Sequence, residues 1–158
     1  MRKLLCIVPL VLLFCFTIAC QNKANKTEDV SEAVVALYSA LNSGNADSFI
    51  QYMAPGGYTE FSEDGGPPFN IDEEYVRRAF KEGLRGDFEV QELKVKVLND
   101  LAVVTGYRVG RFIIPNKQSD KSKLRLSMLW FCQEGKWKLV HVHLSPSIQQ
   151  GRKLFDVS

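Results

Sequence analysis

His141 and His143 are the only histidines of the 158-residue chain, and they stand two positions apart near its C-terminal end. Imidazole can bind a transition metal or act as a general base near neutral pH. A metal site would need a third ligand, and no cysteine or suitably spaced carboxylate stands near the pair in the sequence. We therefore expect a structural or interface role for the two histidines, with metal binding or catalysis as the alternative, and we predict no cofactor.

Arg108 is a further residue that could take part in binding or catalysis. It lies between Gly106 and Gly110 among apolar residues, so we expect its guanidinium to be buried. A buried arginine needs a carboxylate partner or an anionic ligand. Glu60 could supply the carboxylate from within the chain, which would give Arg108 a purely structural role. The alternative is a ligand with an acidic group, and the sequence leaves both open.

The first twenty residues carry chemistry of another kind. Arg2 and Lys3 precede a mostly apolar run of 16 residues, Leu4–Ala19. This is the layout of a secretory signal peptide, and the run is shorter than the ~20 residues of a comfortable bilayer span. The ending, residues 17–20 (TIAC), resembles the lipobox of bacterial lipoproteins, in which the cysteine receives a diacylglyceryl group. The resemblance implies lipidation of Cys20 and durable anchoring by acyl chains; an ordinary signal peptide with a chance cysteine is the alternative.

Composition argues against several other functions. Two of the 20 basic residues fall in the predicted signal peptide, so residues 20–158 carry 18 basic and 18 acidic side chains and no formal net charge. No basic stripe or Arg-rich run is present, so nucleic acid is not an expected partner. Cys6 and Cys15 leave with the signal peptide, and Cys20 is consumed by lipid. Only Cys132 then remains, which excludes an intramolecular disulfide and a metal site of the Cys₂ or Cys₄ type.

The sequence after Cys20 predicts a short tether and three helices. Residues 21–26 are polar and lack apolar periodicity, which is typical of a flexible tether. Thr27 is expected to cap a helix whose apolar stripe runs from Val30 to Leu41 and ends at residues 42–44. Asn45 begins a shorter helix that ends at residues 55–57, and a brief strand at 58–61 precedes a loop at 64–68. Asp72 is expected to cap the third helix.

From Gly86 the apolar period changes from 3.6 to 2, which predicts four long strands. They cover residues 88–97, 101–114, 124–133 and 136–145, with tight turns at 99–100 and 134–135. The apolar parity reverses between Val90 and Leu93, which indicates a β-bulge or a sharp bend. Helices followed by a run of antiparallel strands predict an α+β fold with the helices packed on one face of the sheet.

Three segments carry a family resemblance: residues 36–47 (ALYSALNSGNAD), Trp130, and residues 135–145 (GKWKLVHVHLS). Together they resemble the nuclear transport factor 2-like superfamily, also called SnoaL-like or ketosteroid-isomerase-like, over residues 30–147. The last segment is similar to the association domain of calcium/calmodulin-dependent protein kinase II and to bacterial lipoproteins of unassigned function. The resemblance implies a cone, in which a bent antiparallel sheet wraps around three N-terminal helices and leaves a pocket at the wide end. The chain then divides into a signal peptide (1–19), a lipidated cysteine with tether (20–26), the domain (27–147) and a tail (148–158).

The resemblance also implies roles for single residues. The kinase association domain lines its pocket with three arginines, and these positions fall on Arg108, Met128 and Leu144. Because two of the three are apolar, we expect an apolar pocket with Arg108 as its principal cation. The expected lining is Arg108, Tyr38, Phe61, Met128, Val142 and Leu144. By strand parity, Trp137, His141 and His143 should share the outer face of the sheet, where we expect a homodimer interface.

Function is left with three candidates, because this fold hosts both enzymes and binding modules. We favour a non-enzymatic, lipid-anchored domain of the bacterial cell envelope that dimerises and binds a small apolar or amphipathic ligand or a protein. The first alternative is an isomerase, cyclase or dehydratase that uses a pocket carboxylate such as Glu60 as general base. The second is an oligomerisation scaffold. Gln21 after the cysteine favours the outer membrane where the organism has two membranes.

Overall fold

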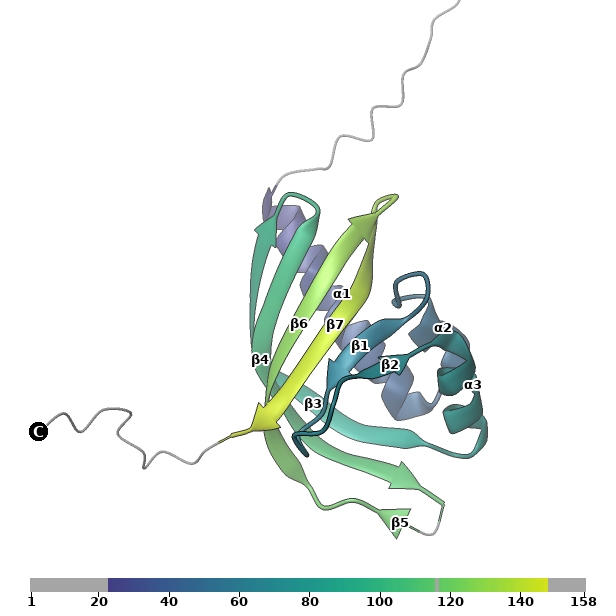
Figure 1. Cartoon of the computed structure of the whole chain (residues 1–158). Coiled ribbons are helices and arrows are strands. Elements are labelled where there is room, and N and C mark those ends of the chain that lie inside the picture. The colour runs from purple at the N-terminus through teal and green to yellow at the C-terminus, as the bar shows by residue number, and fades with distance from the viewer. Residues whose placement is uncertain (1–22, 116, 148–158) are drawn as a thin grey trace, which may run out of the picture.

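The computed structural model describes residues 23–115 and 117–147, which form three helices and seven strands (Figure 1). The helices are α1 (Lys23–Ser43), α2 (Ala46–Ile50) and α3 (Glu73–Lys81). The strands are β1 (Tyr58–Phe61), β2 (Phe69–Ile71), β3 (Arg85–Leu98), β4 (Leu101–Ile114), β5 (Lys117–Gln118), β6 (Ser122–Gln133) and β7 (Lys136–Pro146). The predicted α+β class is confirmed. The predicted signal peptide, Cys20 and the C-terminal tail lie outside the described residues.

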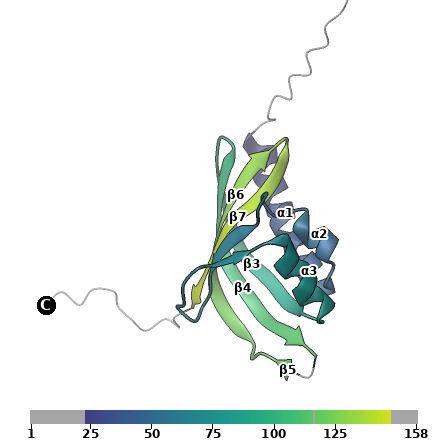
Figure 2. The ribbon, with the colours of Figure 1, turned by 45° about the vertical axis from the view of Figure 1, so that its right-hand side comes forward.

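All seven strands belong to one sheet with the order β2-β1-β7-β6-β4-β3, and β5 pairs with the C-terminal end of β4, beyond the residues of β4 that pair with β6. The three helices lie together on one side of this sheet (Figure 2). The prediction of an all-antiparallel sheet is wrong at one place, because β1 runs parallel to β7. The chain leaving α2 already lies along β7 in this direction, since the Leu139 N–H donates to the Tyr52 carbonyl and the Ala54 N–H donates to the Leu139 carbonyl. The sheet is therefore mixed.

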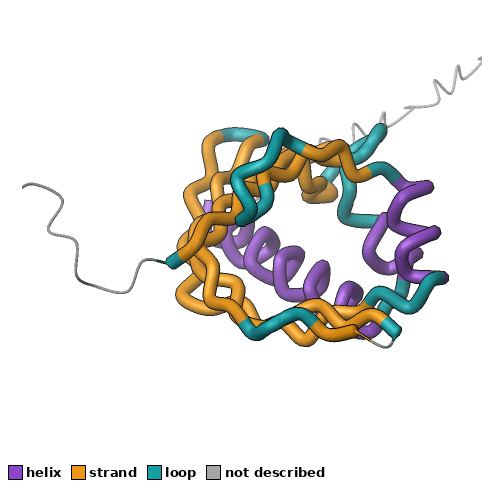
Figure 3. The backbone as a smooth tube through the Cα atoms, turned by 60° about the horizontal axis from the view of Figure 1, so that its bottom comes forward, coloured by secondary structure: helices purple, strands orange, loops and turns teal. Residues whose placement is uncertain are grey.

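The predicted bend of the sheet is confirmed. The register of β3 against β4 shifts between Gln91 and Lys94, and Glu92 adopts a φ of 54° inside this β-bulge. Gly106 of β4 faces the bulge so closely that a Cβ there would lie 2.8 Å from the Gln91 carbonyl oxygen. Bulges bend the strand that carries them and increase its twist. The long strands consequently curve around α1, as the end-on view of Figure 3 shows.

A second bulge, which the sequence did not predict, interrupts the pairing of β6 with β7 between Leu129 and Trp130. Trp130 pairs with Leu139 and Leu129 pairs with His141, so the intervening residue of β7 has no partner in the ladder. A one-residue insertion exchanges the two faces of a strand. Odd-numbered residues of β7 before the bulge, such as Leu139, therefore point to the same side as even-numbered residues after it, such as Val142.

Helix α1 buries the stripe that the sequence predicted, with Val30 and Val34 fully inaccessible to solvent. It begins at Lys23 rather than after Thr27, so the last four residues of the predicted tether are helical. The Lys26 ammonium donates to the Asn99 carbonyl oxygen over 3.1 Å and lies 3.8 Å from an Asp100 carboxylate oxygen. These contacts bind the first turns of α1 to the β3–β4 turn, which explains the earlier start.

The caps of α2 and α3 are those predicted. The Ser48 N–H donates to the Asn45 side chain over 3.0 Å, and the Tyr75 N–H donates to Asp72 over 2.8 Å. Helix α2 is shorter than expected and ends at Ile50, ahead of the turn that leads into β1. Strand β2 was not predicted; it lies directly after the loop at 64–68 and pairs with β1. Strand β2 forms one end of the sheet, and α3 begins two residues after it, at Glu73.

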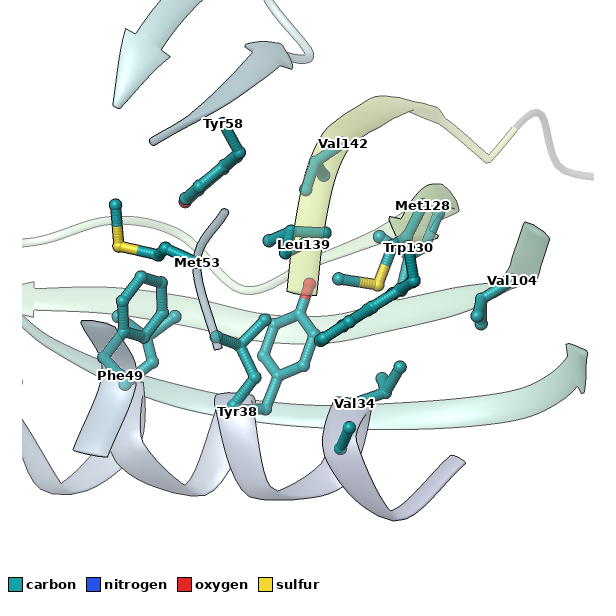
Figure 4. Close-up of a cluster of buried hydrophobic side chains, with 14 of the residues drawn as sticks. Val34, Tyr38, Phe49, Met53, Tyr58, Val104, Met128, Trp130, Leu139 and Val142 are labelled. Carbon is teal, nitrogen blue, oxygen red and sulfur yellow. The ribbon is translucent and has the colours of Figure 1, made fainter. Parts of the chain in front are cut away.

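The core fills the space between α1 and the inner face of the sheet. Trp130 of β6 is fully buried there, and Leu139 of β7 is 1% exposed. Figure 4 shows both among the side chains that α1, β1, β6 and β7 contribute to this core, together with Met128, Val142 and the two tyrosines Tyr38 and Tyr58. The same inner face therefore supplies the core and the walls of the site described next.

Candidate functional site

The inner face of the sheet and the helices enclose a cavity of about 430 Å³. Its walls come from the C-terminal half of α1, from α2 and α3, and from the inner faces of β1, β4, β6 and β7. It lies between the inner face of the sheet and the three helices, each of which contributes side chains to its lining. Most of the lining is apolar: Leu37, Leu41, Phe49, Ile71, Val76, Ala79, Phe80, Leu84, Phe112, Met128, Leu139 and Val142. A cavity of this size and composition suits a small organic molecule.

Arg108 is the only cation among the described residues that line this cavity. It is 6% exposed, and its guanidinium carbon lies 4.5 Å from the ring centre of Phe88 and 5.4 Å from that of Phe112. Its Nε atom has no hydrogen-bond partner, and it forms no ion pair with any carboxylate of the described residues. The guanidinium is therefore held by two aromatic faces, with part of its hydrogen-bonding capacity unused.

Glu60 is the only carboxylate among the described residues of the lining. It projects inward from β1, and its Oε1 atom accepts a hydrogen bond from the Ser62 hydroxyl over 3.2 Å. Burial raises the pKa of Glu60 above its usual value, while the charge of Arg108 and the Ser62 hydrogen bond oppose that rise. Burial dominates, because the cavity offers the carboxylate fewer favourable contacts than water would.

Tyr38 and Tyr58 are buried tyrosines that line the same cavity. Burial raises the pKa of Tyr38 to about 12, although Arg108 lowers it through its charge and through a hydrogen bond to the hydroxyl. Burial also raises the pKa of Tyr58 well above 10, and the charge of Glu60 adds to that rise. Figure 4 shows Tyr38 extending from α1 and Tyr58 from β1 into the apolar cluster. Both are neutral phenols near pH 7 and can donate hydrogen bonds to a bound molecule.

Comparison of the sequence with known protein families identifies the family of this chain. The SnoaL-like domain matches residues 30–149 of the chain. The chain belongs to the SnoaL-like family. No curated protein matches the sequence.

Solved structures with the same fold differ widely in sequence from this SnoaL-like chain. It is similar to an NTF2-like protein of unknown function in nutrient uptake from Rhodospirillum rubrum, with a TM-score of 0.64 and 18% identity over 76% of this chain and 99% of that one. An NTF2-like protein from Cytophaga hutchinsonii has a TM-score of 0.65 and 12% sequence identity over 80% of this chain and 100% of that one. The CaMKII hub of S. rosetta has a TM-score of 0.62 and 21% sequence identity over 77% of this chain and 96% of that one. At these identities the likeness shows the fold alone.

Four of the six residues predicted to line the pocket of this SnoaL-like domain do so, namely Arg108, Tyr38, Met128 and Val142. Leu144 is buried at 2% exposure but lies outside the cavity lining. Phe61 is 39% exposed and lies on the outer side of β1, because Tyr58 and Glu60 take the inward positions of that strand. The prediction for Phe61 is wrong, since it followed the apolar character of the residue rather than the parity of the strand.

The predicted outer face is divided by the second bulge. His141 and His143 do lie on that face, and the Phe61 ring centre is 5.7 Å from each imidazole centre. The Nδ1 atom of His141 is 2.7 Å from the Thr59 hydroxyl oxygen. Trp137 is 7% exposed and points inward, because the bulge exchanges the faces of β7 between Leu139 and His141. Within the described residues, no group of three side chains could hold a metal ion.

Sequence reasoning missed the part of the cavity that α2, α3 and Phe112 supply. Val76 and Phe80 are the buried side chains of α3, but nothing in the sequence tells which surface they cover. Phe112 follows the curved end of β4, where Gly110 adopts a φ of 141° that changes the course of the strand. The alternation of apolar residues in this segment is too irregular to assign Phe112 a side.

Proposed function

We propose that this SnoaL-like domain binds, in its cavity, a small and mainly apolar molecule that carries one acidic group, and that it acts without catalysis. The observation that carries the proposal is Arg108, a nearly inaccessible cation that lines the cavity and forms no ion pair among the described residues. Taking a guanidinium out of water is costly unless charges and hydrogen bonds compensate it. A ligand carboxylate would supply both, through charge-assisted hydrogen bonds.

The remaining lining supports an apolar body for this ligand. Met128 and Val142 border the cavity from β6 and β7, and Phe49 and Phe80 border it from the helices. Buried apolar surface contributes roughly 25 cal/mol per Å², so such a body adds affinity without needing further polar contacts. The neutral hydroxyl of Tyr38, already in contact with Arg108, can donate a second hydrogen bond to the acid.

The test compares octanoate with octanol by isothermal titration calorimetry. We expect octanoate to bind the wild-type protein, and the Arg108→Met variant to lose at least tenfold in affinity for octanoate while its affinity for octanol stays within about twofold. Arg125→Met is the matched control, because Arg125 is exposed on β6. Equal weakening of both probes in Arg108→Met, or no binding of octanoate to the wild type, would contradict the proposal.

A second candidate, general-base catalysis by Glu60, has its own supporting observation. Glu60 shares the cavity with Tyr38 and Tyr58, and its pKa is raised by burial, as a base for proton abstraction requires. A neutral tyrosine could donate to the oxygen that becomes an enolate. The test is deuterium uptake next to the carbonyl of cyclohexanone in D₂O, followed by NMR. Catalysed exchange that Glu60→Gln removes would favour this candidate over simple binding.

We further propose that the domain is exported and tethered to the bacterial cell envelope by lipid on Cys20. What supports this is the signal-peptide layout and the lipobox-like ending of residues 17–20. Helix α1 begins three positions later, at Lys23, beside the β3–β4 turn. The cavity is lined by the C-terminal half of α1, away from Lys23 at which the helix begins.

Homodimerisation through the outer face of the sheet is proposed as well. Phe61 and Phe131 are 39% and 42% exposed on this face, and Leu101 and Val103 extend it to the β3–β4 end. His141 and His143 lie between these groups, on β7. Exposed apolar surface without a helix to cover it is typical of an interface. The hub from S. rosetta makes assembly a reasonable expectation for this fold, although its likeness to this chain extends to the fold alone.

A further inference from the structure

The cavity holds one cation and one carboxylate that are not paired with each other. Arg108 enters from β4 and Glu60 from β1, and both border the same space without forming an ion pair. Arg108 rests on the rings of Phe88 and Phe112, while Glu60 accepts a hydrogen bond from Ser62. When both groups are ionised, the cavity lining carries one positive and one negative charge, and each charge acts on the other without an ion pair.

An anionic ligand would disturb this balance. A carboxylate next to Arg108 adds a second negative charge to a space that contains a single positive one. In surroundings of low polarity, two carboxylates that share one cation do not both stay ionised, and one of them binds a proton. The ligand carboxylate takes the direct contact with Arg108, so Glu60 is the group that must accept the proton.

The groups around Glu60 offer no other compensation. Tyr38 on α1 and Tyr58 on β1 are neutral phenols near pH 7, Tyr75 lines the cavity from α3, and Arg108 is the one cation among the described residues of the lining. Glu63, in the loop after β1, is exposed and adds a further negative charge. The two histidines lie on the opposite face of the sheet. Burial already raises the pKa of Glu60 before any ligand enters, so its protonation requires only a further shift in the same direction.

We propose that the cavity takes up an acidic ligand together with one proton, which Glu60 removes from solvent and holds as long as the ligand stays bound. The inference rests on the proposed function and narrows its ligand class to monoanionic carboxylic acids. The protonated Glu60 then donates a hydrogen bond to an oxygen of the ligand, and the loaded site has one cation for one anion. Dicarboxylates are disfavoured, because a second negative charge would have no partner in the cavity. Binding becomes stronger as the pH falls.

The test is calorimetric titration of the wild-type protein with octanoate, at about pH 7, in two buffers that differ in their enthalpy of ionisation. Octanoate is fully ionised under these conditions, so any proton taken up goes to the protein. We expect the observed heats to differ in proportion to the two buffer enthalpies, with a slope near one proton per ligand. The affinity should fall as the pH rises, by up to about tenfold per pH unit.

Glu60→Gln is the decisive variant, since glutamine keeps the size and the hydrogen-bonding side chain but cannot titrate. We expect it to bind octanoate without proton uptake, with no pH dependence, and more tightly than the wild type at pH 8. Glu63→Gln, the exposed neighbour, should retain the full proton uptake. Equal heats in the two buffers for the wild type, or proton uptake that persists in Glu60→Gln, would overturn the inference and leave acid binding intact. Absence of octanoate binding to the wild type would overturn both proposals.

Discussion

Arg108→Met distinguishes a ligand-binding arginine from a structural one through its effect on the free energy of unfolding. If Arg108 formed a buried ion pair with Glu60, breaking it would cost about 3–5 kcal/mol. The structure instead gives it two aromatic contacts, to Phe88 and Phe112, each contributing about 0.5–2 kcal/mol. Methionine can replace them with sulfur–aromatic contacts of about 0.3–1.5 kcal/mol each, and it removes a desolvated charge that no carboxylate of the described residues pairs.

These contributions nearly cancel, so we expect the variant to lose no more than about 1 kcal/mol, which is a decrease of roughly 2–6 °C in Tm for a domain of this size. Urea denaturation followed by circular dichroism measures the change, because a shift of the midpoint at constant m-value reports stability alone. Leu139→Ala is the positive control, since Leu139 is 1% exposed and its truncation should cost about 2–5 kcal/mol. A loss of 3 kcal/mol or more in Arg108→Met would refute the reasoning.

Three further predictions concern the cavity carboxylate, the anchor and the oligomer. Burial raises the pKa of Glu60 in the folded state, so ionisation of Glu60 destabilises the fold as the pH rises above the unfolded value of about 4.5. Glu60→Gln should therefore be more stable than the wild type at pH 7. Denaturation measured at a series of pH values should show this gain vanishing towards acid pH. Cys20→Ser should abolish metabolic labelling with radioactive palmitate, because a hydroxyl cannot replace the thiolate that accepts the lipid, and labelling that survives would contradict the anchor. Analytical ultracentrifugation should find at least a dimer at high micromolar concentration, and Phe131→Lys should shift it to monomer; a wild-type monomer would exclude the proposed interface.

Much of the fold could be predicted because local patterns encode it. The stripe of α1, the capping side chains Asn45 and Asp72, and the turns at 99–100 and 134–135 each depend on residues close together in the chain. The bend in β3 was also readable, since the apolar residues change face between Val90 and Leu93. The parallel pairing of β1 with β7 was not readable, because it joins residues some 80 positions apart, such as Thr59 and His141.

The site was predicted less well, for an identifiable reason. In β7 the residue at the bulge, Val140, is itself apolar, so Leu139, Val140 and Val142 do not show on which side the strand changes face. In β3, by contrast, charged residues alternate with apolar ones, and the same kind of bulge is visible. Arg108 was identified because a charged residue between two glycines in an apolar strand is exceptional. Glu60 was weighed as the partner of Arg108 and as a possible general base, and its position in the cavity followed from the fold.

A crystal structure of the protein with octanoate would test acid binding at Arg108 most directly. We predict a ligand carboxylate oxygen about 2.7–2.9 Å from a guanidinium nitrogen of Arg108, with the alkyl chain against Met128 and Val142. Glu60 should remain unpaired with Arg108 and should approach the ligand within hydrogen-bond distance. A structure in which Arg108 forms an ion pair with Glu60, or in which the octanoate carboxylate points away from Arg108, would contradict the account.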